Sequence, residues 1–436
     1  MAKWWRRRPT PVEALSTHSS LTGVLGASWR ASVTTWGDLE FDDGSAPLQW
    51  FVAADDRWHH PSREAAVRQR LIEGVPVFET RMRVPRGDVV QTIWSATAGG
   101  VGVTVIDVAN ESALPIAAAF SRTDLVTSRP TASSQEWPAP GLDLPSRPLV
   151  VPIGHRSSAR VVLRHDGRVD PLSADVPDAE SVVRGWLAVA ERSGRLAVPD
   201  VVDGVPLADR VMAARCQAIL HGDDGEKAAE RLLDLDERVR ANLETTDAVE
   251  IAGLVEELLA DLRLRRADTT TARLALTAGA RLLADDRRAI DDLVSSVATC
   301  RGTRADDLVA AWGDVEPATS LDVSRHVLPA LVHDRLARLT GRDTVTLLAD
   351  GMPADWFGAS CEAHGIAVGA RHRVSFAVRW HGERPAVLWE VDGPPGLTLR
   401  SGVDDSWSTT ESRGEALWNV PRRPPTTLSV GSQSLS

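Results

Sequence analysis

The chain has 436 residues, of which 43% are hydrophobic and 25% are charged, and a formal net charge of −11. This length predicts two or three domains with enough apolar surface for sizeable cores. The negative charge argues against a nucleic-acid or acidic-membrane partner, because such partners attract basic surfaces. No stretch reaches the ~20 apolar residues that a membrane-spanning helix needs. No apolar segment follows the basic residues 3–8, as it would in a signal peptide. We therefore expect a cytoplasmic protein that begins with a basic arm at residues 1–20.

Residues 21–172 predict an antiparallel β-sandwich. Apolar and polar positions alternate in residues 101–106 and 159–164, as on strands with one buried face. Turn-forming residues separate further short runs of this kind. These runs occupy residues 47–53, 66–72, 75–84, 88–95 and 115–122.

Residues 173–340 predict an α-helical domain, because the apolar period changes from two to that of a helix. Pro329 starts or kinks a helix within residues 320–339. The other predicted helices lie at residues 178–194, 205–221, 225–243, 247–262, 270–284, 286–299 and 305–312.

Residues 341–418 predict a second β-segment. Residues 374–380 and 386–391 alternate as two strands joined by a turn, and a second turn at 393–396 leads to residues 397–400. This pattern predicts a three-stranded antiparallel meander. The tail at 419–436 is rich in Pro, Ser and Thr, so we expect it to be disordered. Together these segments predict an α+β multidomain protein.

The C-terminal residues also resemble a known family. The string Val374-Ser-Phe-Ala-Val-Arg-Trp-His-Gly-Glu-Arg-Pro-Ala-Val-Leu-Trp-Glu390 is similar to the closing β-segment of bacterial amylo-α-1,6-glucosidase and glucoamylase-like proteins. Asp355-Trp-Phe-Gly358 and Trp407-Ser-Thr-Thr-Glu-Ser-Arg-Gly-Glu415 extend the similarity. The order of sandwich, helices and β-segment is that of the six-hairpin glycosidase clan. The resemblance implies a barrel of twelve helices, which would need about 300 residues at ordinary lengths. Since about half of that is present, we expect a reduced, barrel-like α/α domain.

The sequence does not reveal a catalytic acid pair. Glycosidases use one carboxylic acid to protonate the leaving oxygen and a second carboxylate on the other side of the bond. The helical segment holds two aromatic residues, Trp186 and Trp312, and acids such as Glu256 and Glu257 fall on polar helix faces. We therefore predict a non-catalytic or glycan-binding relative of these glycosidases. An active, reduced glycoside hydrolase acting on α-glucans and a regulatory or scaffolding protein with a protein partner remain as alternatives. The oligomeric state stays open.

The residues predicted to bind a glycan are two tryptophans and their acidic neighbours. Flat indole faces stack on sugar rings, while carboxylates accept hydrogen bonds from sugar hydroxyls. Trp356 beside Asp355, and Trp407 after Asp404 and Asp405, lie in turn-rich stretches that suit such a role. By contrast, Trp380 and Trp389 alternate with apolar residues on strands, so we expect them in the core.

No cofactor or metal site is expected. The chain has no phosphate-binding glycine loop and no G-x-G-x-x-G motif after a strand. His326 and His333 are seven residues apart with Asp334 adjacent, whereas a helical zinc site prefers i, i+4 spacing and a third ligand. The Trp58-His59-His60 segment, after Asp55-Asp56, also offers metal or sugar ligands, but we expect it to form a surface turn.

Overall fold

The computed structural model describes residues 20–421 except 134–143, 146, 171–174, 223–226, 264–268, 284–287, 290, 293–294, 296–322, 342 and 370. The chain divides into two compact units. Unit 1 comprises Met1–Ile72 and Pro76–Arg184, and unit 2 comprises Glu73–Val75 and Gly185–Ser436. The mixture of helices and mostly antiparallel sheets confirms the α+β class.

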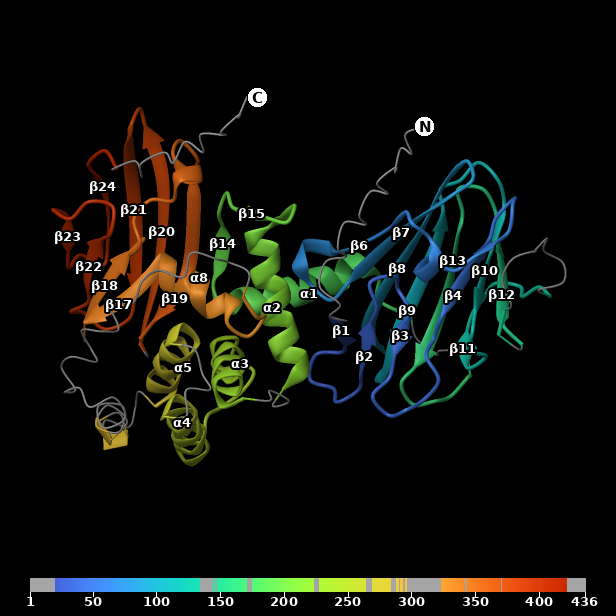
Figure 1. The fold of residues 1–436 in the computed structure, drawn as a ribbon, viewed down its shortest axis with the longest axis horizontal. Coiled ribbons are helices and arrows are strands. Elements are labelled where there is room, and N and C mark those ends of the chain that lie inside the picture. Colours follow the sequence, from blue (N-terminus) through green and yellow to red (C-terminus); the bar gives the residue numbers. More distant parts are fainter. Residues whose placement is uncertain are drawn as a thin grey trace, which may run out of the picture. The chain divides into compact units, whose positions relative to one another are not determined.

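Unit 1 is built from antiparallel sheets (Figure 1). A six-stranded sheet has the order β11-β13-β9-β8-β7-β6, and a four-stranded sheet has the order β12-β10-β4-β5. The strands of the first are β6 (Val67–Leu71), β7 (Phe78–Val84), β8 (Gly87–Ala98), β9 (Val101–Asn110), β11 (Leu125–Val126) and β13 (Ser158–Arg164). Those of the second are β4 (Trp50–Ala53), β5 (Trp58–His59), β10 (Ile116–Phe120) and β12 (Leu149–Ile153). A smaller sheet joins β1 (Ser20–Gly23), β2 (Arg30–Val33) and β3 (Leu39–Glu40).

The two larger sheets share one apolar core. Trp50 and Phe120 from the four-stranded sheet pack with Phe78, Ile93 and Ile106 from the six-stranded sheet. The alternation of apolar and polar residues in the sequence produces this core, because every second residue of a strand points to the same side of its sheet. The predicted sandwich is thus present in unit 1.

Unit 2 combines helices with two C-terminal sheets (Figure 1). Its helices are α2 (Leu207–His221), α3 (Ala228–Arg240), α4 (Ala248–Arg263), α5 (Thr269–Leu282) and α8 (Leu328–Leu336), while α1 (Ala179–Ala190) contains the boundary between the units. Short 3₁₀ helices are η1 (Pro61–Arg63), η2 (Ile72–Gly74), η4 (Glu191–Ser193) and η5 (Ala354–Trp356). Along the described parts of the chain, no helix is long and apolar enough to cross a membrane.

The first C-terminal sheet has the order β14-β19-β20-β21-β24 and the second has the order β17-β18-β22-β23. The first contains β14 (Arg195–Ala197), β19 (Cys361–Val368), β20 (His372–His381), β21 (Arg384–Asp392) and β24 (Arg413–Leu417). The second contains β17 (Ala337–Gly341), β18 (Thr344–Leu347), β22 (Thr398–Ser401) and β23 (Ser408–Thr409). A short hairpin pairs β15 (Val201–Val202) with β16 (Val205–Pro206).

Two cores hold unit 2 together. The first gathers apolar residues of both C-terminal sheets, of α2 and of α8, including Phe376, Trp389 and Trp418. The second lies among α3, α4, α5 and α8 and is mostly aliphatic. Helix α8 contributes to both cores, through Leu328 and Val332 to the first and through Ala330 and Leu331 to the second. The helices and the C-terminal strands are therefore packed into one unit.

The predicted meander is wrong in its third strand. β20 and β21 pair as expected, but β22 pairs in parallel with β18, and β24 takes the place beside β21. β22 lies beside β18 and not beside β21 because this position buries Leu397 and Leu399 in the first core of unit 2. The predicted helix at 305–312, most of that at 286–299, and nearly all of the arm and tail lie outside the described residues.

Glycine geometry in unit 1 gives a test of the fold. Gly37 has a φ of +88°, and a Cβ there would lie 2.0 Å from Gln91 Oε1, whose amide nitrogen already donates to Gly37 O. Gly44 has a similar φ of +76° but open space around it.

We expect Gly37→Ala to destabilise the protein by about 2–4 kcal/mol, because the new side chain adds overpacking to backbone strain. Gly44→Ala should cost only about 1 kcal/mol. Chemical denaturation of both variants checks this, and equal losses would contradict the packing described.

Candidate functional site

Helix α3 buries charged side chains on its inner faces. Asp234, Asp236, Glu237, Arg238 and Arg240 are all buried, although they alternate with leucines that fill the helical core. Neighbouring elements contact several sides of the helix, since α2, α4, α5 and η4 all pack on it. Buried charges are stable only when paired, so these residues must find partners within the fold.

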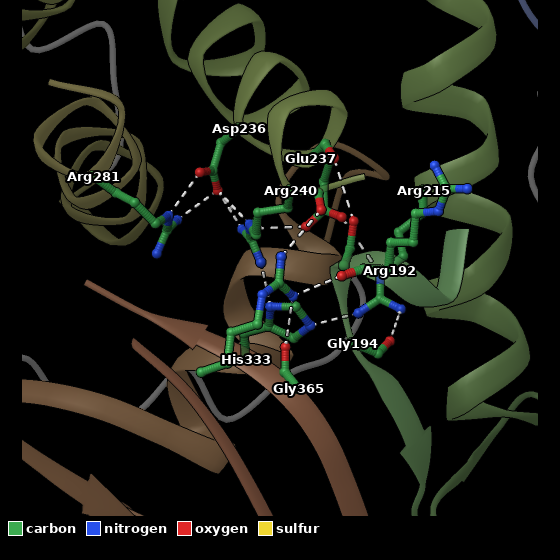
Figure 2. Close-up of polar contacts among 11 residues, drawn as sticks. Arg192, Gly194, Arg215, Asp236, Glu237, Arg240, Arg281, His333 and Gly365 are labelled. Atoms are coloured by element: carbon green, nitrogen blue, oxygen red, sulfur yellow. Dashed lines mark hydrogen bonds and ion pairs between the residues drawn. The ribbon is translucent and has the colours of Figure 1, made fainter. Parts of the chain in front are cut away.

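Asp236 is held between two arginines. Arg281 of α5 donates from Nε to Oδ1 at 2.7 Å and from Nη2 to Oδ2 at 2.5 Å, and Arg240 donates from Nε to Oδ2 at 2.9 Å. Burial alone would raise the pKa of Asp236, but the charges of Arg240 and Arg281 outweigh it and lower that pKa. Figure 2 shows one edge of the Arg281 guanidinium on the acid and its third nitrogen turned away. Asp236 is therefore an ionised anchor for both arginines.

His333 of α8 lies between two guanidinium groups. Arg215 Nη2 is 2.5 Å from its Nε2, and Arg240 Nη1 contacts its Nδ1 (Figure 2). Burial, reinforced by the charges of Arg240 and Arg215, holds the pKa of His333 well below the ordinary 6.5. A neutral imidazole accepts at one nitrogen only, because the other carries a proton. Both arginines therefore face the ring, but only one can donate to it.

Positive charge exceeds negative charge in this cluster. Arg215, Arg240 and Arg281 face two carboxylates, Asp236 and Glu237, while His333 is neutral. Glu237 approaches Arg240 Nη2 at 3.2 Å and Arg215 Nε at 3.5 Å, yet neither of its oxygens makes a hydrogen bond to a described residue. These five residues and His333 form what we call the arginine cluster.

A further arginine adds to the excess. Arg373 of β20 donates from Nη1 to the carbonyls of Arg192 and Gly365, at 2.7 and 3.0 Å, and from Nη2 to Arg240 O at 3.3 Å. Its pKa is lowered by burial and by the charge of Arg240, with Asp392 acting in the opposite direction. The guanidinium thus binds carbonyls, which bring no negative charge.

A cavity of about 40 Å³ opens beside the arginine cluster. Its polar lining consists of Arg240, Arg281, His333, Thr277 and Asp334, and the remainder is mostly aliphatic. Asp334 is already engaged, because it receives both Nη groups of Arg273 at 2.9 and 2.7 Å and Arg338 Nε at 2.9 Å. The positive groups in the lining are therefore not balanced by Asp334.

Of the two residues predicted to bind a glycan near position 356, the tryptophan is buried and the acid is exposed. Trp356 in η5 is only 4% exposed and donates from Nε1 to Asp200 Oδ2 at 2.7 Å, whereas Asp355 is exposed. In this conformation the Trp356 indole packs in the first core of unit 2 and does not present a face to solvent. Burial raises the pKa of Asp200, against the lowering effect of the Trp356 hydrogen bond. The binding role of Trp356 and Asp355 stays a prediction.

The residues predicted near 407 lie on the connection from β22 to β23. Trp407 is half-buried, and its ring lies 5.2 Å from Trp389 and 5.4 Å from Trp418, centroid to centroid. Asp405 is exposed beside it. Asp404 is buried and accepts hydrogen bonds from backbone and side-chain donors of Ser406 and Asn419, at 2.6–3.1 Å. Asp404 therefore fixes the loop, and Trp407 and Asp405 remain accessible to a ligand.

Of the histidines considered in the sequence, all but His333 lie within 3.5 Å of a carboxylate, whereas His333 contacts two arginines. His326 Nδ1 lies 2.8 Å from Asp234 Oδ2, away from the partners of His333. In the Trp58-His59-His60 segment the predicted surface turn is wrong, because all three side chains are buried. His59 can be buried because its ring nitrogens contact Glu64 and Asp56 at 3.0 and 2.9 Å. No group of three or more His, Cys, Asp or Glu that could hold a metal ion occurs among the described residues.

Sequence reasoning missed the arginine cluster. The run of acids and arginines at 234–240 reads as a solvated helix face, and the partners come from distant segments. One signal was present: Leu232, Leu233 and Leu235 occupy more than one face of the same helix, which is typical of a helix buried all round. Comparison with known proteins adds no assignment, because no protein-family model and no curated protein matches the chain.

The depressed pKa of His333 predicts how stability depends on pH. Below about pH 6.5 the unfolded chain binds a proton at this residue that the folded chain does not, so stability falls as the pH falls. The slope is at most about 1.4 kcal/mol per pH unit for this one proton. We expect His333→Gln to flatten the dependence between pH 5 and 6.5, measured by chemical denaturation. His364→Gln, which alters an exposed histidine of the same unit, is the control. An unchanged slope in His333→Gln would contradict the assignment.

Proposed function

We propose that the chain is a carbohydrate-binding protein related to glycogen-debranching and glucoamylase-like glycosidases, and that it binds a glycan without cleaving it. The sequence resemblance at 374–390 and 407–415 supports the class of ligand. The observation that carries binding is the placement of Trp407. Its indole is partly exposed, and the rings of Trp389 and Trp418 support it from within the core.

A supported aromatic ring suits sugar binding for a physical reason. An indole that is already fixed loses little conformational entropy when a ligand stacks on it. The exposed carboxylate of Asp405 beside it can accept hydrogen bonds from sugar hydroxyls. Asp404, through its bonds to Ser406 and Asn419, keeps this loop in one conformation. We infer that Trp407 and Asp405 form the glycan contact.

The chemistry of the buried acids argues against hydrolysis at the arginine cluster. A glycosidase acid must be protonated at working pH, which requires a raised pKa. Arg240 and Arg281 instead lower the pKa of Asp236. We propose that the helices are a reduced form of the clan's helical barrel, supported by the common core of α3, α4, α5 and α8. A cytoplasmic location is part of the same proposal.

Thermal unfolding with maltooligosaccharides, larger α-glucans and trehalose tests glycan binding. A ligand that binds the native state alone raises the midpoint by mass action. We expect a shift with at least one glucan and no release of reducing sugar. Trp407→Leu should weaken the affinity at least about tenfold, or about 1.4 kcal/mol. Trp380→Leu, at another half-buried indole of the same unit, should leave the shift in place. No shift with any sugar would contradict the proposal and would favour a regulatory or scaffolding role with a protein partner.

One observation favours an active hydrolase as the second candidate. The carboxyl of Asp200 is half-buried with a raised pKa, lies against the Trp356 indole and is affected by the charge of Asp355. In glycosidases, a carboxylic acid beside a tryptophan can act as the proton donor while a second carboxylate nearby takes another role. Asp200 is the residue that would act as the acid.

A reducing-sugar assay on α-glucans decides between the candidates. If the chain is a hydrolase, Asp200→Asn should lower the rate by about 10²–10⁴-fold, the usual contribution of a general acid. The raised pKa would also extend activity to higher pH than a carboxyl with the ordinary value of 3.8 allows, because the acid stays protonated longer. Asp343→Asn, at an exposed aspartate of the same unit, is the control. Absence of sugar release from the wild-type protein would exclude this candidate for the glucans used.

A further inference from the structure

The arginine cluster and the cavity beside it have a property that glycan binding does not use. The buried charges are unequal: in the described part of the chain Arg215, Arg240 and Arg281 form ion pairs with Asp236 and Glu237 alone, and the charge of Glu191 acts on Arg215 from farther away. Leaving a guanidinium without a counter-charge in a protein interior is costly, and arginine does not lose its proton at ordinary pH. Water in the cavity would solvate the excess charge but would not neutralise it. The imbalance therefore calls for an anion.

The contacts of His333 also favour a bound anion. Both ring nitrogens face guanidinium donors, and the neutral ring can satisfy only one of them. An anion in the cavity would resolve the conflict. His333 would accept from Arg215 at Nε2 and donate its Nδ1 proton to the anion, and Arg240 Nη1 would turn from Nδ1 to donate to the anion as well.

The cavity has the size and lining for a small oxyanion. One water needs about 10–15 Å³ of such a cavity. The volume of about 40 Å³ therefore holds about three waters. Arg281 directs one guanidinium nitrogen away from Asp236 (Figure 2), and no bond of this nitrogen to a described residue competes with a ligand. The aliphatic lining from Leu274 and Ala330 lowers the local dielectric and strengthens such contacts. The carboxylate of Asp334 also lines the cavity, but Arg273 and Arg338 neutralise it.

We propose that this cavity, lined by Arg240, Arg281, His333 and Thr277, binds a phosphate group. Guanidinium groups match the geometry of phosphate oxygens and bind them with charge-assisted hydrogen bonds. The group can belong to free phosphate or to a phosphate ester whose organic part extends out of the cavity. The inference does not rest on glycan binding, because its residues lie on α3, α5 and α8 and not on the loop that holds Trp407.

Thermal unfolding and isothermal titration calorimetry with inorganic phosphate test the proposal. At a phosphate concentration a hundredfold above Kd we expect the midpoint of unit 2 to rise by about 5–10 °C. Chloride at the same ionic strength should give no such rise. Arg281→Gln should reduce the phosphate affinity at least about tenfold. The matched control is Arg379→Gln, which removes an exposed arginine that pairs with Glu362 in the same unit, and it should bind phosphate as the wild type does.

Glucose 1-phosphate, glucose 6-phosphate and glucose distinguish the sources of the group. Tighter binding of an ester than of phosphate assigns an ester, and equal or weaker binding of the esters assigns free phosphate. Titration of the wild-type protein decides whether phosphate binds even if Arg281→Gln does not fold. Absence of phosphate binding heat in the wild type would overturn the proposal, whatever the glucans do. An Arg281→Gln variant that folds and binds phosphate unchanged would overturn it as well.

Discussion

The pairing of buried charges on α3 is the constraint on which unit 2 depends. This helix contacts neighbours on several sides, so its acids and arginines cannot reach bulk water, and each needs a partner from another element. Asp236 obtains Arg281 from α5, His326 supplies a partner to Asp234, and Arg240 reaches His333 on α8. These contacts connect the helices to one another. Arg373, which donates to Arg240 O, extends the connection to the C-terminal sheet.

The same constraint separates the two ligand sites that we propose. Arg240 and Arg281 lower the pKa of Asp236, so this buried acid is a poor proton donor. The excess of arginine that remains suits an anion and not a neutral sugar ring. The partly exposed indole of Trp407 has the opposite character, because it is apolar and has one exposed carboxylate nearby. Phosphate and glycan are thus expected on chemically different surfaces of one unit.

Periodicity predicted the elements well and the partners poorly. The alternation in residues 101–106 and the helical period in 205–221 report local burial, and β9 and α2 occupy those segments. The arginine cluster depends on contacts between residues up to 118 positions apart, such as Arg215 and His333, which no local pattern contains. Likewise, the turn-rich surroundings of Trp356 contain no sign of Asp200, which lies 156 residues earlier and accepts the hydrogen bond of the indole nitrogen. The parallel pairing of β22 with β18 was missed for the same reason.

Isothermal titration of the wild-type protein with maltoheptaose, followed by mass analysis of the recovered sugar, tests the central claim most directly. Binding without cleavage requires a saturable heat and a sugar of unchanged length. That result would place the chain among the non-catalytic relatives of the glycosidases and direct attention to the loop of Trp407. A saturable heat with shortened products would contradict the account and would make Asp200 the first residue to replace. Absence of any heat would remove the glycan from the account.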